Sequence, residues 1–207
     1  MSENSMNFTL TIKNYRCFPD EKPVYISMGK GFTAFIGANN SGKSSLSKLF
    51  YELRNLFANI SRSNDNFIQA MRSDAGFAFV LAQSVHDNIE IFCNANTRDI
   101  MLEISAKANV EDRYEGISPE KIILTIPRGT NRFTAKLIED GKHIDTTIKN
   151  IQIKRVGSPH IKVGDKLIYM EAYYQAFEAL SKTIYIGPFR NAVNIGGHEN
   201  YYDMTIG

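Results

Sequence analysis

Cysteine and histidine are scarce in this sequence, and neither forms a pattern that could hold a metal ion. The two cysteines, Cys17 and Cys93, lie far apart and show no metal-binding or redox spacing. Such usage suits a reducing compartment. The four histidines are scattered and match no ligand motif; they are His86, His143, His160 and His198.

Long apolar runs and a strong charge of one sign are also lacking. The longest apolar run, Phe77–Ala82, is far shorter than the roughly 20 residues that cross a bilayer. Met1–Thr11 is polar and lacks the apolar core of a secretory signal. The formal net charge is +2, so overall electrostatics give no sign of nucleic-acid binding. We expect a soluble, cytoplasmic protein with no membrane partner.

One motif stands out against this plain composition. The sequence Gly37-x-x-x-x-Gly42-Lys43-Ser44 is the pattern of a phosphate-binding loop. Backbone N–H groups in such a loop cradle the α- and β-phosphates of a nucleotide. Lys43 is expected to reach the β- and γ-phosphates, and the Ser44 hydroxyl to ligate Mg²⁺. The pattern therefore predicts ATP and Mg²⁺ as ligands.

The surroundings of the loop agree with this interpretation. Phe32–Ile36 is a short apolar run that predicts a buried parallel strand. After the loop, apolar residues recur at helical spacing, which predicts an amphipathic helix; they are Leu46, Leu49, Phe50, Leu53 and Leu56. Strand, loop and helix in this order are the expected context of the motif.

The rest of the chain mixes strand and helix patterns, which predicts an α/β protein. With 207 residues, 43% of them hydrophobic, we expect one domain or a domain with an insertion. Met170–Leu180 has helical spacing, Phe67–Met71 and Phe77–Leu81 are helical or core-lining, and Asp140-Gly141 is a hairpin signal. Strands are predicted at Phe8–Ile12, Val24–Met28, Ile89–Phe92, Ile100–Ile104, Ile122–Ile126, Phe133–Ile138, Thr146–Lys154, Ile161–Val163 and Thr183–Ile186.

Two segments carry a resemblance to a known family. Leu10–Phe18, which contains Ile12-x-Asn14-Tyr-Arg16-x-Phe18, and Ile36–Leu46 resemble the start of ABC-type ATPase heads. The likeness is to the RecF, SMC and OLD (overcoming lysogenisation defect) group. Tyr185–Arg190 is similar to the Y-I-G-P-x-R segment of OLD-like and related defence ATPases.

The resemblance implies a P-loop NTPase fold, namely the N-terminal half of an ABC-type head with an antiparallel β lobe. It divides the chain into a P-loop core (1–56), a helical and antiparallel β lobe (57–182) and a Q-loop-like segment (183–207). The implied nucleotide-binding residues are Gly37, Asn39, Asn40, Ser41, Gly42, Lys43, Ser44, Ser45 and Arg16. Arg190 is an implied sensor, although the glutamine usual in a Q-loop is absent.

Each arginine also has a simpler interpretation. Arg16 equally fits an exposed charge at a strand end, and the segment before Arg190 fits a Gly-Pro turn. Lys149, Lys154 and Arg155 fit a solvated sheet face better than a nucleic-acid groove.

Motifs of a complete ABC head are missing after Lys43. We find no L-S-G-G-like signature and no apolar strand ending in Asp-Glu; Ile138-Glu139-Asp140 is the nearest and sits in a hairpin turn. We therefore expect the N-terminal half of a larger ATPase, able to bind ATP without hydrolysing it. Whether the chain itself is an enzyme stays open.

Three functions remain as hypotheses. In the first, ATP binding holds a homodimer or larger assembly and controls a nuclease or toxin effector in anti-phage defence. The second is a RecF- or SMC-like DNA repair ATPase, with DNA as a further candidate partner. The third is a non-catalytic scaffold that binds ATP for assembly only.

Overall fold

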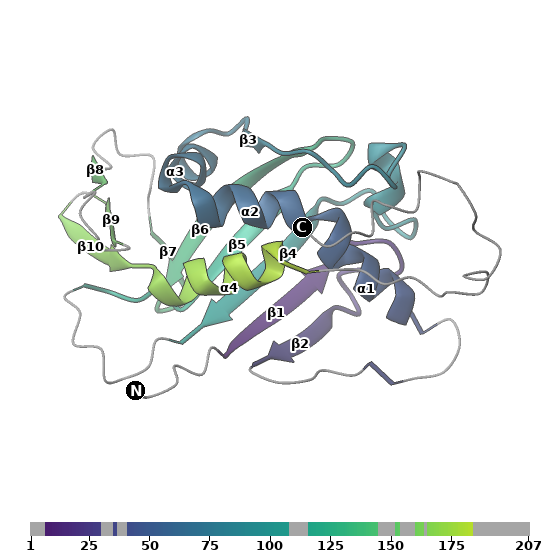
Figure 1. Ribbon diagram of the computed structural model, residues 1–207, viewed down its shortest axis with the longest axis horizontal. Coiled ribbons are helices and arrows are strands. Elements are labelled where there is room, and N and C mark those ends of the chain that lie inside the picture. Colours follow the sequence, from purple (N-terminus) through teal and green to yellow (C-terminus); the bar gives the residue numbers. More distant parts are fainter. Residues whose placement is uncertain are drawn as a thin grey trace, which may run out of the picture.

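An antiparallel sheet organises the fold, and helices α1 (Lys43–Glu52), α2 (Arg54–Arg62) and α4 (Glu171–Ser181) cover one of its faces (Figure 1). The computed structural model describes residues 7–29, 35–36, 41–107, 116–144, 152–153, 160–163 and 165–183. The strand order is β2 (Val24–Met28), β1 (Phe8–Lys13), β4 (Ile100–Ala106), β5 (Lys121–Ile126), β6 (Arg132–Glu139) and β3 (Phe77–Ala78), with β7 (Lys142–His143) paired to β6.

Alternating apolar residues give the sheet one buried face. Leu10 on β1 lies opposite Ile26 on β2 and Ile104 on β4. Ile104 in turn lies opposite Ile122 on β5. Leu10, Ile104 and Ile122 are fully buried, because successive side chains of a strand point to opposite faces and these point toward the helices.

The helices bury the apolar stripe that the sequence predicts. Leu46, Leu49, Phe50, Leu53 and Leu56 are all buried, which confirms the amphipathic pattern. The pattern runs through two helices, because α1 ends at Glu52 and α2 begins at Arg54. The Phe57 ring on α2 stacks on the Phe177 ring of α4, with the two centroids 6.4 Å apart.

A third helix and a small second sheet complete the described structure. Helix α3 (Asn64–Arg72) follows α2 directly, and it contains the predicted Phe67–Met71. Strands β8 (Gln152–Ile153), β9 (His160–Val163) and β10 (Lys166–Tyr169) form the second sheet. Two backbone hydrogen bonds join it to Ile117: Ile117 N–H donates to Leu167 O, and Tyr169 N–H donates to Ile117 O, each at 2.8 Å.

Most of the predicted strands are confirmed, with boundaries shifted by one or two residues. They include β1, β2, β4, β5, β6 and β9. The strands in the middle of the chain pair in antiparallel fashion, as expected. Asp140 and Gly141 turn the chain between β6 and β7 with φ angles of 49° and 71°, which is typical of a type I′ hairpin. Of the predicted strand Thr146–Lys154, only Gln152 and Ile153 lie within the described residues, where they form β8; of Thr183–Ile186, only Thr183 does.

Two predicted elements differ in the structure. The strand predicted at Ile89–Phe92 is instead the 3₁₀ helix η1 (Asn88–Ile91). The Asp87 side chain accepts a hydrogen bond from Ile89 N–H at 2.9 Å and so stabilises a helical turn over an extended strand. Phe77–Leu81 begins with the short strand β3 rather than a helix, although Phe79 and Leu81 line the core.

The apolar run before the phosphate loop also departs from expectation. Of Phe32–Ile36, only Phe35 and Ile36 lie within the described residues. They belong to no strand, and Ile36 is 95% exposed rather than buried. Every strand pair among the described residues is antiparallel and none includes Ile36, so the described part of the chain provides no parallel strand beside it.

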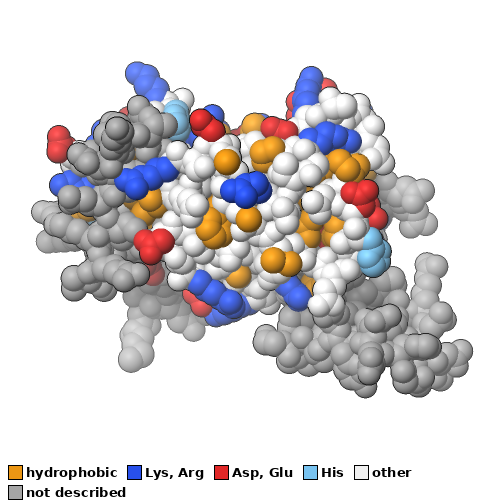
Figure 2. Space-filling model, turned by 90° about the horizontal axis from the view of Figure 1, so that it is seen from above, with side chains coloured by type: hydrophobic (Ala, Val, Ile, Leu, Met, Phe, Trp, Pro, Cys, Tyr) orange, Lys and Arg blue, Asp and Glu red, His pale blue; other side chains and the backbone are white. Residues whose placement is uncertain are grey.

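Charged side chains of both signs are interspersed on the face that Figure 2 shows, with apolar side chains between them. This mixture matches the small net charge of the sequence. No helix among the described residues is long and apolar enough to cross a membrane.

Candidate functional site

The end of the predicted phosphate loop lies at the start of α1. Gly42 precedes the helix with φ 88° and ψ 5°, and Lys43 is the first helical residue. The Leu46 N–H donates to Gly42 O at 2.9 Å, which closes the first turn. Gly37, Asn39 and Asn40 lie outside the described residues, as do Arg190, Lys149, Lys154 and Arg155.

The first turn of α1 has the electrostatic character of an anion site. The first N–H groups of a helix have no intrahelical partners, and the helix dipole places partial positive charge there. No acidic residue lies in the first turn, and the N-cap residue, Gly42, makes no side-chain hydrogen bond to the N–H groups of that turn. The Lys43 Nζ donates to Ser41 Oγ at 3.2 Å. Ser44 is exposed beside it.

Gly42 is held beneath two side chains from another part of the chain. A Cβ built on Gly42 would lie 2.5 Å from Phe18 Cε1 and 2.9 Å from Cys17 Sγ. Both contacts are shorter than real Cβ atoms make, so a residue with a Cβ would have to displace these side chains as well as adopt a φ that favours glycine. Phe18 and Cys17 belong to a turn after β1, residues Asn14, Tyr15, Arg16, Cys17 and Phe18, which we call the 14–18 turn. A backbone hydrogen bond from Phe18 N–H to Tyr15 O closes it.

The same turn also reaches the far end of α1. Arg16 Nη2 lies 2.6 Å from Glu52 Oε1, and its Nε lies 3.3 Å from Glu52 Oε2. The Tyr15 hydroxyl donates to Glu52 Oε2 at 2.5 Å. Tyr15 is fully buried and Glu52 is 2% exposed. These three residues form a buried cluster, which we call the Glu52 cluster.

The protonation states of Tyr15 and Arg16 match the contacts that both make with Glu52. Burial raises the pKa of Tyr15 well above its ordinary value, and the Glu52 carboxylate adds to the effect, so the hydroxyl stays protonated and donates. Burial alone would lower the pKa of Arg16, but the hydrogen bonds and charges of Glu52 and Tyr15 outweigh it and raise that pKa. Arg16 is therefore a cation that neutralises the buried carboxylate. It is not the exposed strand-end charge of the simpler interpretation.

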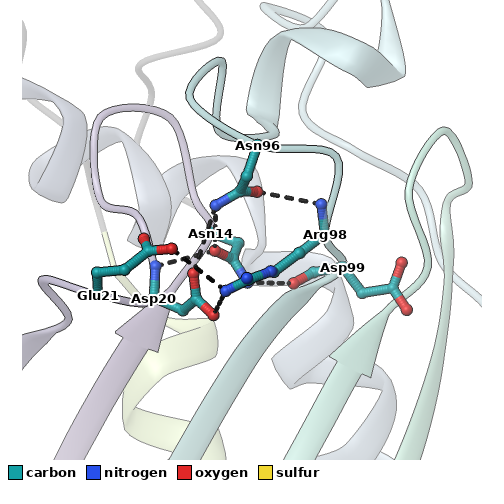
Figure 3. A network of polar contacts seen from close by, with 6 residues as sticks. All are labelled: Asn14, Asp20, Glu21, Asn96, Arg98 and Asp99. Atoms are coloured by element: carbon teal, nitrogen blue, oxygen red, sulfur yellow. Dashed lines mark hydrogen bonds and ion pairs between the residues drawn. The ribbon is translucent and has the colours of Figure 1, made fainter.

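A polar network holds the 14–18 turn from the other side (Figure 3). Asn14 Nδ2 donates to Asp99 O at 2.9 Å, and Asn14 Oδ1 accepts from Asp20 N–H at 3.0 Å and from Asn96 Nδ2 at 2.9 Å. Arg98 forms an ion pair with Asp20 across the same network. Asn14 adopts φ 60°, a left-handed conformation that asparagine tolerates better than most residues.

Backbone contacts extend this support to the neighbouring segment. Arg16 N–H donates to Ile91 O, and Cys93 N–H donates to Asn14 O, each at 2.9 Å. Arg128 Nη1 donates to Cys93 O at 3.2 Å. The turn is therefore fixed between α1 on one side and residues 91–99 on the other.

Cys17 and Cys93 are both free thiols. The described residues hold no group of three His, Cys, Asp or Glu that could bind a metal ion.

Glu52 was not singled out from the sequence, and Asn14 and Tyr15 appeared there only as positions of the family motif, with no role assigned. One signal could have found Glu52: it lies three residues after Leu49 and four before Leu56, on the apolar stripe of the helices. A carboxylate on a buried stripe requires a partner, since charged groups are buried only when paired.

Comparison with known proteins supports a nucleotide site. A family model described as an AAA ATPase domain matches residues 6–189, which includes β1, the 14–18 turn, the phosphate loop and α4. No curated protein matches the chain.

Proposed function

The chain belongs to the AAA ATPase domain family, and we propose that it binds ATP with Mg²⁺ at the loop that ends in Gly42, Lys43 and Ser44. The observation that carries the proposal is the position of Gly42 and Lys43. Gly42 turns the chain in a left-handed conformation with Phe18 and Cys17 packed against it, and Lys43 then opens α1. The glycine spacing of the motif thus coincides with a helix N-terminus, where phosphate binds well.

The residues present suit a nucleotide phosphate group. The N–H groups of the first turn of α1 and the Lys43 ammonium group would contact phosphate oxygens, and Ser44 would supply a hydroxyl ligand to Mg²⁺. The metal would neutralise phosphate charge when bound. Repulsion is low, because no carboxylate lies in the first turn of the helix.

Calorimetry with Mg·ATP tests this proposal. We expect Lys43→Ala to abolish binding or weaken it strongly, since it removes the cation of the loop. Lys48→Ala is the matched control, because Lys48 is an exposed residue of the same helix and its loss changes the net charge equally. Equal affinity in wild type and Lys43→Ala would refute the site. An equal loss of affinity in Lys43→Ala and Lys48→Ala would mean that the loss reflects only a nonspecific charge effect.

A narrower part of the proposal concerns assembly. By resemblance to ABC-type heads, ATP would be bound between two copies of the protein, and Arg190 would meet a phosphate or a partner carboxylate near that contact. Light scattering of the full-length protein with and without ATP, and with Arg190→Ala, tests this. We expect a dimer or larger species that depends on ATP and on Arg190. A monomer under all three conditions would rule out binding of ATP between two copies of the protein.

The biological role in this proposal is control of a nuclease or toxin effector in anti-phage defence. Its support is the similarity of Tyr185–Arg190 to the corresponding segment of OLD-like ATPases. Phage-challenge assays with wild type and Lys43→Ala in the native gene context would test it. Protection that is unchanged by Lys43→Ala, or absent in wild type, would contradict the role.

A further inference from the structure

We propose that Arg16 and Glu52 are a positioning pair: they set the orientation of α1, and through it the position of Lys43, and Arg16 does not itself contact the nucleotide. The inference rests on the proposed ATP site and assigns a role to residues at the opposite end of the helix. It also replaces the family-implied role of Arg16 as a nucleotide ligand with one that acts through Glu52.

Arg16 and Glu52 contact each other at two points. Both Nε and Nη2 of Arg16 face the two carboxylate oxygens of Glu52, at 3.3 and 2.6 Å. Such two-point contact fixes the direction of the guanidinium group as well as its position. The side chain of Glu52 is 3% exposed and that of Arg16 is 22% exposed, so the ion pair lies largely away from water.

Separating the pair would leave Glu52 without a countercharge. If Arg16 turned toward a nucleotide, Glu52 would remain buried with the Tyr15 hydroxyl as its hydrogen-bond donor and without its cation. A buried carboxylate that loses its countercharge is strongly destabilising. Arg16 is therefore committed to Glu52.

Glu52 lies at the opposite end of α1 from Lys43. The two residues are nine positions apart in the helix, so Glu52 lies about 14 Å along the axis from Lys43. The 14–18 turn contacts α1 at both ends: Phe18 and Cys17 pack against Gly42, and Tyr15 and Arg16 bind Glu52. One turn thus fixes both the start and the end of the helix that carries the phosphate-binding residues.

The 14–18 turn is itself supported from the side away from α1. Arg16 and Asn14 are tied by backbone hydrogen bonds to Ile91 and Cys93, and the Asn14 side chain donates to the backbone of Asp99, the residue before β4. Through these bonds the sheet, the 14–18 turn and α1 form a connected unit. Loss of the Glu52 contact would release one end of α1 from that unit.

Glu52→Gln is the deciding variant. It keeps a hydrogen-bond acceptor for Tyr15 and removes the charge that holds Arg16. A positioning role predicts that affinities for Mg·ATP and Mg·ADP both fall by about tenfold, since the whole loop is misplaced, and that amide hydrogen exchange in α1 rises without nucleotide. If Arg16 were a ligand, Glu52→Gln would release it, and affinity would stay the same or increase.

A double-mutant cycle with Arg16→Met adds an independent readout. Because both residues act through one contact, we expect the double variant to bind ATP no more weakly than the weaker single variant, to within about twofold. The inference would be overturned if the losses of affinity in the two single variants multiplied in the double variant, or if affinity for ATP fell while affinity for ADP did not. Glu103→Gln is the control: Glu103 pairs with Lys13 and Lys121 on the sheet, and this change should leave nucleotide affinity within about twofold.

The two hypotheses fail in different ways. If wild-type protein binds no ATP but Glu52→Gln still raises hydrogen exchange in α1, the ATP site is wrong and the positioning of α1 holds. If wild type binds ATP, Lys43→Ala does not, and Glu52→Gln changes neither affinity nor exchange, the ATP site holds and the positioning pair is wrong.

Discussion

The Phe18 ring lies so close over Gly42 that a Cβ at position 42 would approach Phe18 Cε1 to 2.5 Å. The two residues are far apart in sequence, yet this contact joins the 14–18 turn to the start of α1. It explains the glycine at position 42 by packing as well as by backbone conformation.

Gly42→Ala should therefore destabilise the protein through two effects. The left-handed φ of 88° costs about 1–2 kcal/mol for a residue with a Cβ, and the clash with Phe18 adds about 1–3 kcal/mol. Gly141→Ala is the control, since its φ is 71° but nothing lies within 4 Å of the added Cβ. Chemical denaturation should show a clearly larger loss for Gly42→Ala. Equal losses would mean that the Phe18 contact adds nothing.

Ser44→Ala should weaken nucleotide binding mainly in the presence of Mg²⁺, because its predicted role is metal ligation. Ser47→Ala serves as the control, since Ser47 is one turn further along α1 and its hydroxyl donates to Lys43 O. Calorimetry with ATP in Mg²⁺ and in EDTA gives the comparison. A loss of equal size in both buffers would contradict metal ligation by Ser44.

Tyr173 and Tyr174 are neighbours on α4 with different hydroxyl environments. The Tyr173 hydroxyl donates to Pro119 O at 2.8 Å, whereas the buried Tyr174 hydroxyl has no hydrogen-bond partner among the described residues. We expect Tyr173→Phe to cost about 1 kcal/mol and Tyr174→Phe to be neutral or stabilising. Thermal unfolding of the two variants would decide, and a larger loss for Tyr174→Phe would contradict the expectation.

Glu103 should make stability depend on pH in the acid range. Burial alone would raise its pKa, but hydrogen bonds and charges from Lys13 and Lys121 outweigh burial and lower it. A carboxyl whose pKa is lower in the folded state stabilises the fold above its unfolded pKa, about 4.3, and the contribution is lost as pH falls through the folded pKa.

Glu103→Gln should therefore lower the melting temperature at pH 7, and the difference from wild type should shrink as the pH falls below about 4. Glu90→Gln is a suitable control, because Glu90 is exposed on η1. A difference for Glu103→Gln that stays constant from pH 7 to pH 3 would show that its charge does not stabilise the fold.

Much of the fold was predictable where the local pattern and the tertiary environment agree. Apolar and polar residues alternate along Phe8–Lys13 and Val24–Met28, and the two strands pair so that their buried residues lie opposite one another. The Asp140-Gly141 turn adopts the backbone conformation that its residues favour. Ile89 and Ile91 have the composition of a strand, but the Asp87 cap makes a short helix there. Local hydrogen bonding outweighed β propensity at that place.

The candidate site divides in the same way. The spacing from Gly37 to Gly42, Lys43 and Ser44 in the sequence predicts a phosphate loop at the start of a helix, and α1 does begin at Lys43. The partner of Arg16 was not predictable, because Glu52 is 36 residues away and meets it only after the turn packs on α1.

Local sequence patterns suffice to predict the phosphate-loop motif, the apolar stripe of α1 and α2, and the alternating strands, because these depend on residues a few positions apart. No local pattern indicates that the 14–18 turn touches both Gly42 and Glu52, or that Arg16 faces a buried carboxylate. An ion pair or a ring contact requires two side chains within a few ångströms of each other. For residues distant in sequence, packing of the whole sheet against its helices sets that distance.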